Sequence, residues 1–592
     1  MKSESNPEDG RRSSWQWWLG ALLILVAFTF GAIGLREYEN APEHGGHADL
    51  LSILYHTLQL FILHAPHLEP PIPWQLHVGR LLAAGLFLAA AGKAFVKVFR
   101  EELRGLRLWL PWREGHIVVC GLGDLGLRLV LDGRQRRKFV VAIEKGAGRG
   151  ALESARKSGA LVLEGDARDL SQLRQARIER AEFIVAACRN DQTNIAIAAL
   201  AGQLAAARNR PSEPLICRLL IRDAKLRSLV SDEAVFPRAG SSYRVNFRDL
   251  DPEATAARQA FRRYPLDFRP IRENDPITVH LVVIGFGPIG QALALQAARI
   301  GHFANEVAKE RRKLRITVLD KDQTGWNDFV LRHAKLKDVC DARFEHYGPG
   351  EAGLLPATSA LCLAGDALVT YAVAIETDKQ TSLRVALELS KTITESPVQI
   401  LVYQQSRVGL ASLLRQRGPG SPQLTRIHAF GMTEDVFTWD VLLHESEDRL
   451  ARAIHENYRR ERAKEHVPDK DNPGWEDLSE DFRESNRQAA DHIAVKLRAV
   501  GYHDEPLTKE KQAIVDFEEQ ETLLLAKMEH VRWCAERWLD GWEFGPVRDP
   551  AKRISDSLVQ WDKLPIDRQK RDIEQVAAIP AVLSEAGLGV HR

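Results

Sequence analysis

The chain is 592 residues long, which is enough for several domains. Its 81 Lys and Arg nearly balance its 80 Asp and Glu, so the net charge of +1 favours neither nucleic acid nor an acidic ligand as a partner. The 6 Cys are scattered without a Cys-x-x-Cys pair, which is typical of reduced structural thiols and predicts neither a disulfide framework nor a metal site.

The first element we expect is a transmembrane helix over residues 15–35, with the sequence WQWWLGALLILVAFTFGAIGL. This segment carries no charged residue, and about 20 apolar residues are needed to cross a bilayer. Its tryptophans would lie at the membrane interface. A signal peptide is the alternative, but the apolar run is long for one, and no small-residue cleavage site follows it cleanly.

A second transmembrane helix is expected over residues 76–99, where Arg80 and Lys93 stand near the ends and can reach the interface. The run of Ala and Gly from Ala83 to Gly92 suits the close approach of another helix. Basic residues precede the first span and follow the second, whereas acidic residues dominate between them. By the positive-inside rule, both termini are expected in the cytoplasm, with residues 1–14 as a cytoplasmic tail.

A short apolar helix is expected between the two spans, over residues 51–63. Its length is about 20 Å, against about 30 Å of hydrocarbon, so it cannot cross the bilayer. The sequence HAPHLEPPIP follows it at residues 64–73. We expect residues 15–99 to form one membrane domain in which the short helix is a re-entrant segment.

An apolar strand running into Gly-x-Gly-x-x-Gly opens the next segment, HIVVCGLGDLG at residues 116–126. A helical pattern follows, and then a second strand that ends in Glu144. In a dinucleotide-binding unit, Gly121, Gly123 and Gly126 let a pyrophosphate approach a helix N-terminus. Glu144 is placed to accept a hydrogen bond from a ribose hydroxyl. The alternative is a tight strand–helix turn that binds nothing.

Two further strands complete this pattern: one is followed by Asp166, and the next leads to Asp191 and Asn194. Together with the glycine motif, these segments resemble the RCK domain (regulator of potassium conductance, the Trk-type NAD-binding fold) over residues 114–262. The resemblance implies a Rossmann-like unit that holds NAD or another adenine nucleotide on its three glycines, Glu144 and Asp166. We include Asp191 among the predicted cofactor-binding residues.

A second Rossmann-like unit is expected over residues 276–435, because its motifs echo those of the first unit in the same order, as after a duplication. The residues that correspond to the first glycine turn and its acid are Gly285, Gly287, Gly290 and Asp320. Asp320 stands farther from its glycines than Glu144 does from its own, so nucleotide binding by this unit is left open. No substrate domain with a catalytic acid or base follows either unit, and an enzyme is therefore not favoured.

The segment EHVRWCAERWLDGWEFGP at residues 529–546 resembles the RyR domain, a tandem helical repeat named for the ryanodine receptor. The resemblance covers residues 440–592 and implies an all-α tandem with a ligand between its halves. The predicted ligand contacts are His530, Arg532, Trp533, Trp542, Phe544 and Trp561. Aromatic rings can stack on a base, and basic groups can hold phosphate. Alternatively, these residues are the core of a small helical domain.

Taken together, the segments resemble a two-transmembrane, RCK-gated ion channel. The predicted fold class is a membrane protein with an α/β cytoplasmic part: two transmembrane helices plus a pore helix, two RCK units and the RyR tandem. The resemblance implies a homotetramer, multi-pass in the inner (plasma) membrane, that passes ions when a nucleotide-like signal binds. The alternative is a membrane-anchored nucleotide sensor without its own pore, and a membrane-bound dehydrogenase comes third.

The segment after the short helix predicts the character of such a pore. It contains no glycine, so a stacked carbonyl filter like that of potassium channels is not expected. The predicted pore-lining residues are His64, His67, Leu68 and Glu69. A ring of these side chains favours a wide and poorly selective opening.

Overall fold

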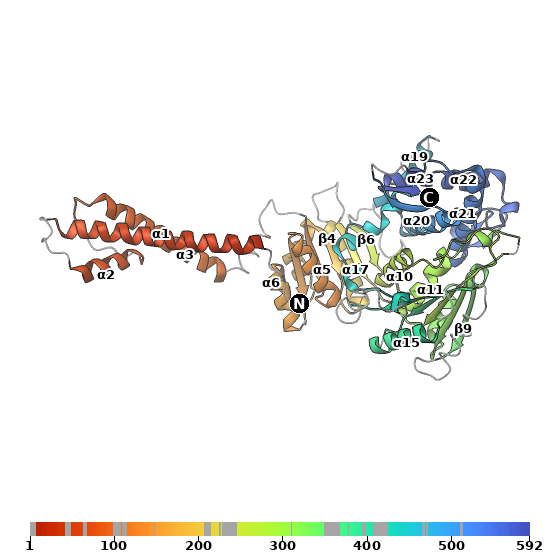
Figure 1. The fold of residues 1–592 in the computed structure, drawn as a ribbon, viewed down its shortest axis with the longest axis horizontal. Coiled ribbons are helices and arrows are strands. Elements are labelled where there is room, and N and C mark those ends of the chain that lie inside the picture. The colour runs from red at the N-terminus through yellow and green to blue at the C-terminus, as the bar shows by residue number, and fades with distance from the viewer. Residues whose placement is uncertain are drawn as a thin grey trace. The chain divides into compact units, whose positions relative to one another are not determined.

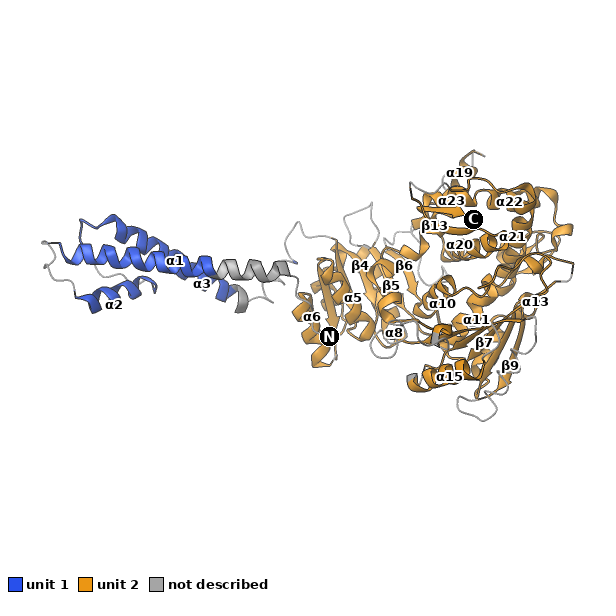
Figure 2. Cartoon of the chain, viewed as in Figure 1, with its two compact units in different colours: residues 1–113 blue, residues 114–592 orange. Residues whose placement is uncertain are grey.

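The computed structural model describes residues 7–41, 49–62, 68–98, 108, 115–146, 148–206, 215–223, 226–227, 245–309, 311–347, 367–376, 378–393, 398–406, 424–464, 468, 472–508 and 513–592. The chain divides into two compact units, residues 1–113 and 114–592 (Figure 2). The first unit holds the apolar helices, and the second holds both sheets and the C-terminal region.

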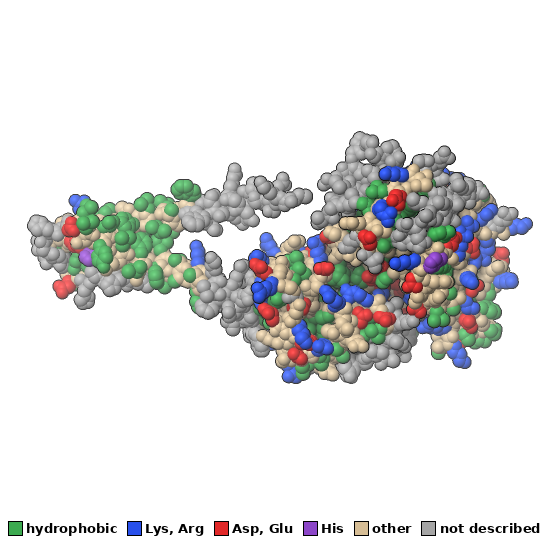
Figure 3. Space-filling view, turned by 90° about the horizontal axis from the view of Figure 1, so that it is seen from below, with side chains coloured by type: hydrophobic (Ala, Val, Ile, Leu, Met, Phe, Trp, Pro, Cys, Tyr) green, Lys and Arg blue, Asp and Glu red, His purple; other side chains and the backbone are tan. Residues whose placement is uncertain are grey.

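The first unit is built from helices α1 (Pro7–Glu39), α2 (Leu50–Leu60) and α3 (Trp74–Val98). Among the described residues, the stretches long and apolar enough to cross a membrane are Trp18–Glu39 in α1 and Trp74–Phe95 in α3. Hydrophobic side chains make up much of the described surface of this unit (Figure 3). The two apolar helices expected from the sequence are therefore present.

Helices α1 and α3 approach each other closely at glycines. A Cβ atom added to Gly79 of α3 would lie 2.6 Å from the backbone nitrogen of Gly31 in α1. A Cβ atom on Gly34 would likewise collide with the backbone of Leu76. Ala83, the first residue of the small-residue run that is expected to approach another helix, is buried in the cluster that joins the three helices. Among the described residues, no heavy atom lies within 4 Å of a Cβ placed on Gly85 or Gly92 of the same run, and the glycines of α1 and α3 that meet are Gly31 and Gly79.

The short helix α2 packs against both longer helices. Its Ile53 and Leu60 are buried in one hydrophobic cluster with Leu35 of α1 and Leu76 of α3. Helix α2 covers most of the short helix expected over residues 51–63. The sequence therefore predicted the existence of this helix, and its role as a pore helix stays a prediction.

The first Rossmann-like unit begins the second compact unit (Figures 1 and 2). Its described strands form one parallel sheet in the order β3-β2-β1-β4-β5-β6. The strands are β1 (His116–Cys120), β2 (Val140–Glu144), β3 (Leu161–Glu164), β4 (Ala181–Ala186), β5 (Leu215–Leu220) and β6 (Val245–Leu250). This is the strand order of dinucleotide-binding folds, in which the ligand binds at the carboxyl ends of the strands where the order reverses, here between β1 and β4.

The second Rossmann-like unit repeats this topology. Its described strands form a parallel sheet in the order β12-β11-β10-β7-β8-β9, which is the first order read from the other end. The strands are β7 (Thr278–Ile284), β8 (Arg315–Asp320), β9 (Asp341–His346), β10 (Ala367–Val373), β11 (Val398–Tyr403) and β12 (Ile427–Phe430). The predicted duplication is confirmed at the level of the fold.

Helices lie on both faces of each sheet, so the central strands are buried throughout. In β1, Ile117 and Val119 pack in one cluster with Leu129 of α5, while α8 packs against β4 and β5. The helices of the two sheets are α5 (Asp124–Gln135), α6 (Arg149–Ser158), α7 (Leu170–Gln175), α8 (Asp191–Ala206), α10 (Pro252–Arg263), α11 (Pro288–Ile300), α12 (Thr324–Arg332), α13 (Leu336–Val339) and α15 (Lys379–Thr392). Burial on both faces explains why these strands appear in the sequence as continuous apolar runs.

After β12, the chain returns to the first Rossmann-like unit through α17 (Thr433–Val436) and α18 (Trp439–Leu442). The backbone N–H of Trp439 donates to the Asp132 carboxylate at 2.7 Å, and Arg136 pairs with Asp440 at 2.6 Å. The Trp439 side chain is almost fully buried and lies against α5. The two Rossmann-like units are thereby tied together by a segment that follows both of them.

The C-terminal region is mostly helical but is not all-α as predicted. Its helices are α19 (Arg449–Lys464), α20 (Glu480–Ala499), α21 (Glu519–Leu539), α22 (Ile566–Ala577) and α23 (Ile579–Glu585). Its strands are β13 (His503–Pro506), β14 (Glu543–Phe544), β15 (Ile554–Ser555) and β16 (Leu588–His591), which form the antiparallel pair β13–β16 and the parallel pair β14–β15. The all-helical prediction is wrong here because these strands are too short to show a period-2 pattern.

The hydrophobic core of the second unit runs without a break into the C-terminal region. One cluster contains Leu281 of β7 and Ala294 of α11 together with Ile493 of α20 and Leu525 of α21. Helices α20 and α21 both contact α11, as the blue and green ribbons show (Figure 1). A change in the packing of the C-terminal helices therefore bears directly on the second sheet.

Candidate functional site

The turn between β1 and α5 forms an open cradle at the carboxyl end of the first sheet. Gly121 has a φ of +96°, which side-chain-bearing residues rarely adopt, and a Cβ there would lie 3.0 Å from Cys188. A Cβ on Gly126 would collide with the carbonyl oxygen of Gly121, so this helix residue must be small for α5 to pack on the turn. These two glycines are explained by the fold alone.

Gly123 is different, because it is the N-cap of α5 and has space around it. Among the described residues, no heavy atom lies within 4 Å of a Cβ placed on Gly123. A helix N-terminus attracts anions through its unpaired N–H groups and its dipole. The residues present therefore fit a pyrophosphate at this turn, as predicted from the sequence.

Glu144 stands at the end of β2 and faces the glycine turn. Its carboxylate accepts hydrogen bonds from the backbone N–H of Leu122 and, at 2.8 Å, from that of Gly146. These bonds orient the carboxylate at the edge of the cradle, where a ribose hydroxyl can reach it. Glu144 is thus held by backbone donors of the glycine turn and of the residues after β2, and its contact with a ribose stays a prediction.

Asp166 follows β3 and is paired with two cations. Its carboxylate lies 3.0 Å from Lys145 and 2.7 Å from Arg168, and it also accepts the Arg168 backbone N–H at 2.9 Å. The hydrogen bond from the Arg168 side chain is the main reason that the pKa of Asp166 is lowered. This cluster places a carboxylate and two cations at the carboxyl ends of β2 and β3.

Asp191 and Asn194, at the start of α8, hold the ends of the strands. The Asp191 carboxylate accepts the backbone N–H groups of Arg222 and Asp223 at 3.0 and 2.9 Å. The buried Asn194 amide donates to the carbonyls of Cys188 and Leu220 at 2.9 and 2.8 Å. Both residues fix the backbone after the carboxyl ends of β4 and β5, and Asn194 is a positioning residue outside the predicted binding set.

Residues 117–223 match the TrkA-N domain. The first Rossmann-like unit is called the TrkA-N unit from here on. A protein of unassigned function from Methanothermus fervidus is 23% identical over 247 residues, which are 39% of this chain and 36% of that protein. The chain thus spans about a third of the length of this curated relative.

Solved structures of the GsuK channel are similar to the chain at low identity. One is 15% identical and covers 73% of this chain and 97% of that chain, with a TM-score of 0.36. The GsuK channel bound to NAD is 12% identical, and the match covers 88% of this chain and 91% of that chain with a TM-score of 0.34. GsuK bound to ADP is 15% identical, and the match covers 73% of this chain and 98% of that chain with a TM-score of 0.35. At these identities and TM-scores, the similarities establish neither a function nor a ligand for this chain.

The second cradle has the same backbone as that of the TrkA-N unit. Gly285 has a φ of +91°, and a Cβ on Gly290 would collide with the Gly285 carbonyl oxygen. The Asp320 carboxylate accepts the backbone N–H groups of Phe286 at 2.6 Å and Asp322 at 3.1 Å. Asp320 therefore occupies the place of Glu144 despite its longer spacing, because the extra residues form a separate connection between α11 and β8.

The cradles differ at Gly287, the second glycine of the second turn. A Cβ on Gly287 would lie 2.8 Å from a carboxylate oxygen of Glu376, which follows β10. Glu376 is not among the predicted site residues. The repeat of the two motifs contains a signal for it, because alignment of CRNDQTN at residues 188–194 with IETDKQT at residues 375–381 places Glu376 opposite Arg189.

In the C-terminal region, the predicted ligand contacts His530 and Arg532 lie in the interior. Arg532 is 2% exposed and pairs with Glu529 at 2.8 Å and Glu536 at 2.6 Å. His530 is 3% exposed and donates to the Val559 carbonyl at 2.8 Å. Both side chains are committed to partners in the core, which favours the alternative interpretation of these two residues.

The predicted aromatic contacts lie nearer the surface. Arg537 lies between Trp533 and Trp542, at 5.7 and 5.2 Å from their ring centroids, in cation–π contacts. Trp561 packs edge-on against the His530 ring at 5.8 Å. Phe544 of β14 is 59% exposed. Of the predicted set, Trp542 and Phe544 are thus better placed for a ligand than the buried polar groups.

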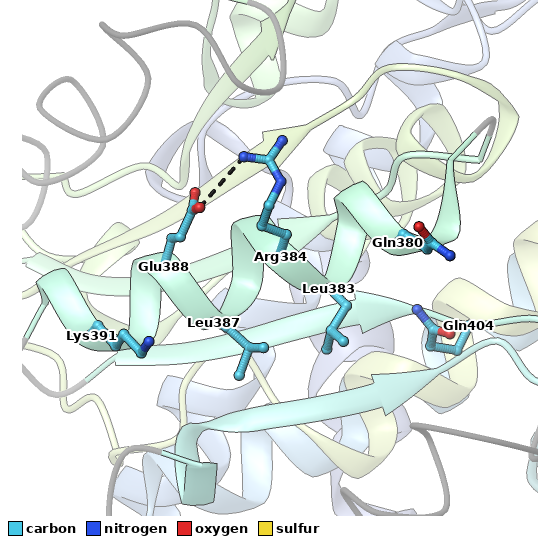
Figure 4. A pocket seen from close by; sticks show the side chains of 7 residues that line it. All are labelled: Gln380, Leu383, Arg384, Leu387, Glu388, Lys391 and Gln404. Atoms are coloured by element: carbon cyan, nitrogen blue, oxygen red, sulfur yellow. Dashed lines mark hydrogen bonds and ion pairs between the residues drawn. The ribbon is translucent and has the colours of Figure 1, made fainter.

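A cavity of about 460 Å³ lies along α15 of the second Rossmann-like unit (Figure 4). It is lined by Gln380, Leu383, Arg384, Leu387, Glu388, Lys391 and Gln404. All but Gln404 stand on successive turns of α15, and Arg384 pairs with Glu388 at 3.4 Å. None of the predicted nucleotide-binding residues lines this cavity.

The predicted pore residues are only partly within the described residues. His64 and His67 lie outside them. Leu68 is half-buried against the cluster that joins the three helices, and the backbone N–H of the exposed Glu69 donates to the Tyr38 hydroxyl at 2.8 Å. Within the described residues, there is no group of three or more His, Cys, Asp or Glu that could hold a metal ion.

Proposed function

We propose that the chain is an ion channel regulated by an adenine nucleotide that binds to the TrkA-N unit. The observation that carries the proposal is the presence, in one chain, of an open dinucleotide cradle and of two apolar helices with a short helix packed on both. The cradle supplies a ligand-binding site, and the helices supply a membrane domain of the kind a pore needs.

NAD or another adenine nucleotide is the proposed ligand. The open space at Gly123 accommodates the phosphates at the N-terminus of α5, and Glu144 accepts a ribose hydroxyl. The match of residues 117–223 to the TrkA-N domain supports the same assignment.

In the membrane, four copies are proposed to surround one axis, with both termini in the cytoplasm and α3 lining the pore. The arrangement of four copies is supported by the surface of α3. From Gly85 to Phe95 this surface is largely exposed within one chain, and its apolar and small residues can pack against further copies. The location proposed is the inner (plasma) membrane. The glycine-free segment that follows α2 supports a poorly selective opening.

The C-terminal region, which resembles the RyR domain in sequence, is proposed to receive a second nucleotide-like signal. Its shared core with α11 and β7 supports a mechanical link, because the helices cannot repack without moving against the second sheet. Trp542 and Phe544 are the proposed contacts for a base.

The direct test is ion flux from liposomes that contain the purified chain. Addition of ADP or NAD is expected to start potassium and sodium efflux at comparable rates. Nucleotide binding without flux of either ion would instead identify a membrane-anchored sensor, and strong preference for potassium would contradict the proposed selectivity.

A further inference from the structure

The second cradle contains an anion supplied by the chain itself. The Glu376 carboxylate accepts the backbone N–H of Ile289 at 2.8 Å, and the same oxygen lies over Gly287, the N-cap of α11. Pro288 begins α11 and has no N–H. Glu376 therefore takes a donor of the first turn that a bound phosphate would use.

The register of the strands shows which residue of the TrkA-N unit corresponds to Glu376. In the first sheet, Cys120 pairs with Ala186 at the ends of β1 and β4, and in the second, Ile284 pairs with Val373 at the ends of β7 and β10. Counting three residues onward from β4 and β10 leads to Arg189 and Glu376. The TrkA-N unit thus has a cation at the position where the second unit has a carboxylate.

This difference changes what each cradle can hold. A carboxylate at a helix N-terminus is stabilised by the same dipole and N–H groups that attract a phosphate. Two anions cannot share these donors. Glu376 also occupies the space over Gly287, whereas the corresponding space over Gly123 in the first unit is open.

We propose that Glu376 closes the second cradle, so that each chain binds one adenine nucleotide, in the TrkA-N unit. This inference deepens the proposed function and rests on it for the first site. The duplicated unit keeps the backbone of a dinucleotide cradle but holds its own carboxylate in place of the ligand.

The test is the stoichiometry of ADP binding to the full-length chain in detergent, by titration calorimetry and native mass spectrometry. Wild type is expected to bind one ADP per chain. Glu376→Ser removes the carboxylate, Glu376→Arg places a cation there as at Arg189, and both are expected to bind two. Glu388→Ser, at a partly exposed position of α15, is the matched control and is expected to bind one.

Combination with Gly123→Val separates the two sites. That substitution is expected to abolish binding in the wild-type background and to leave one ADP in the Glu376→Ser background. Two ADP on wild type, or no gain in either Glu376 variant, would overturn the inference. If wild type binds none and a Glu376 variant binds one, the proposed function fails at the first site while closure of the second site stands.

Discussion

Arg218 of β5 donates a hydrogen bond to the carboxylate of Glu445 at 2.7 Å, with both side chains buried. The same carboxylate accepts from Arg248 of β6, from Arg452 of α19 at 2.6 Å and from the Trp475 indole at 3.1 Å. Burial alone would raise the pKa of Glu445, but the surrounding arginines lower it. A single carboxylate therefore joins the far edge of the TrkA-N unit to the C-terminal region.

Glu445→Gln is expected to destabilise the protein by about 3–5 kcal/mol, because it leaves buried arginines without their counter-charge. Denaturant titration measures the free energy of unfolding of the variant and of the wild type. Glu388→Gln is the control, since its ion pair with Arg384 is exposed and is worth about 0–1 kcal/mol. Equal stability of the two variants would show that Glu445 does not hold the TrkA-N unit and the C-terminal region together.

The glycines of the first cradle are expected to differ in what they do. Gly126→Ala should destabilise the fold by about 1–3 kcal/mol, because its Cβ meets the Gly121 carbonyl oxygen. Gly123→Ala should leave stability within about 1 kcal/mol of wild type, because its Cβ enters open space. Thermal unfolding of both variants measures the contrast, and a stable Gly126→Ala would contradict the described packing.

Nucleotide affinity is expected to depend on Glu144. Glu144→Ala removes a charged hydrogen bond to the ribose, which is worth about 1.5–3 kcal/mol, so binding should weaken by about 10–100-fold. Glu164→Ala is the control, because Glu164 is the register partner of Glu144 on β3 but forms an exposed ion pair with Arg156. Calorimetry with NAD and ADP measures the affinity of both variants. Unchanged affinity in Glu144→Ala would show that Glu144 does not contact the nucleotide.

His530 is expected to make stability fall with rising pH. Burial alone would lower its pKa, but hydrogen bonds to Asp572 and Cys534 raise it to about 10, and its two ring nitrogens face the Asp572 carboxylate and the Val559 carbonyl. A raised folded-state pKa gives stability that is complete below about pH 6.5, the unfolded value, and is lost as pH rises toward 10.

The measurement is the free energy of unfolding at pH 6.5, 8 and 9.5 for wild type and His530→Gln. The wild type should lose about 1–3 kcal/mol more than the variant over this range, since the variant has no proton to release. Parallel curves would show that His530 is neutral in the folded protein.

Much of the fold could be predicted because both sheets are parallel and buried on both faces. Strands such as β1 and β7 therefore appear as short apolar runs ahead of glycine turns, and the duplication repeats these signals in order. The acid of the second unit was also found, although its spacing differs, because it still ends the strand after α11. The short strands of the C-terminal region could not be found, because strands of two to four residues show no local period.

The chemistry of the sites was harder to predict, because it depends on burial and on contacts between distant segments. His530 and Arg532 look like ligand contacts in the sequence, but Glu529, Glu536 and Asp572 neutralise them in the core. Glu376 looks like an ordinary polar residue after a strand, and only the packing of β10 beside β7 brings it over Gly287. The residue types in the sequence showed where charged side chains are concentrated. Which of these side chains are buried against partners and which remain accessible depends on tertiary contacts.

The measurement that tests the central claim most directly is the current through the purified chain in planar bilayers, recorded with and without ADP or NAD on the cytoplasmic side. We predict that nucleotide raises the open probability at least about tenfold and that Gly123→Val, which closes the open cradle, removes this response. Nucleotide that binds to the wild type by calorimetry but evokes no current, or an equal response in Gly123→Val, would contradict the account.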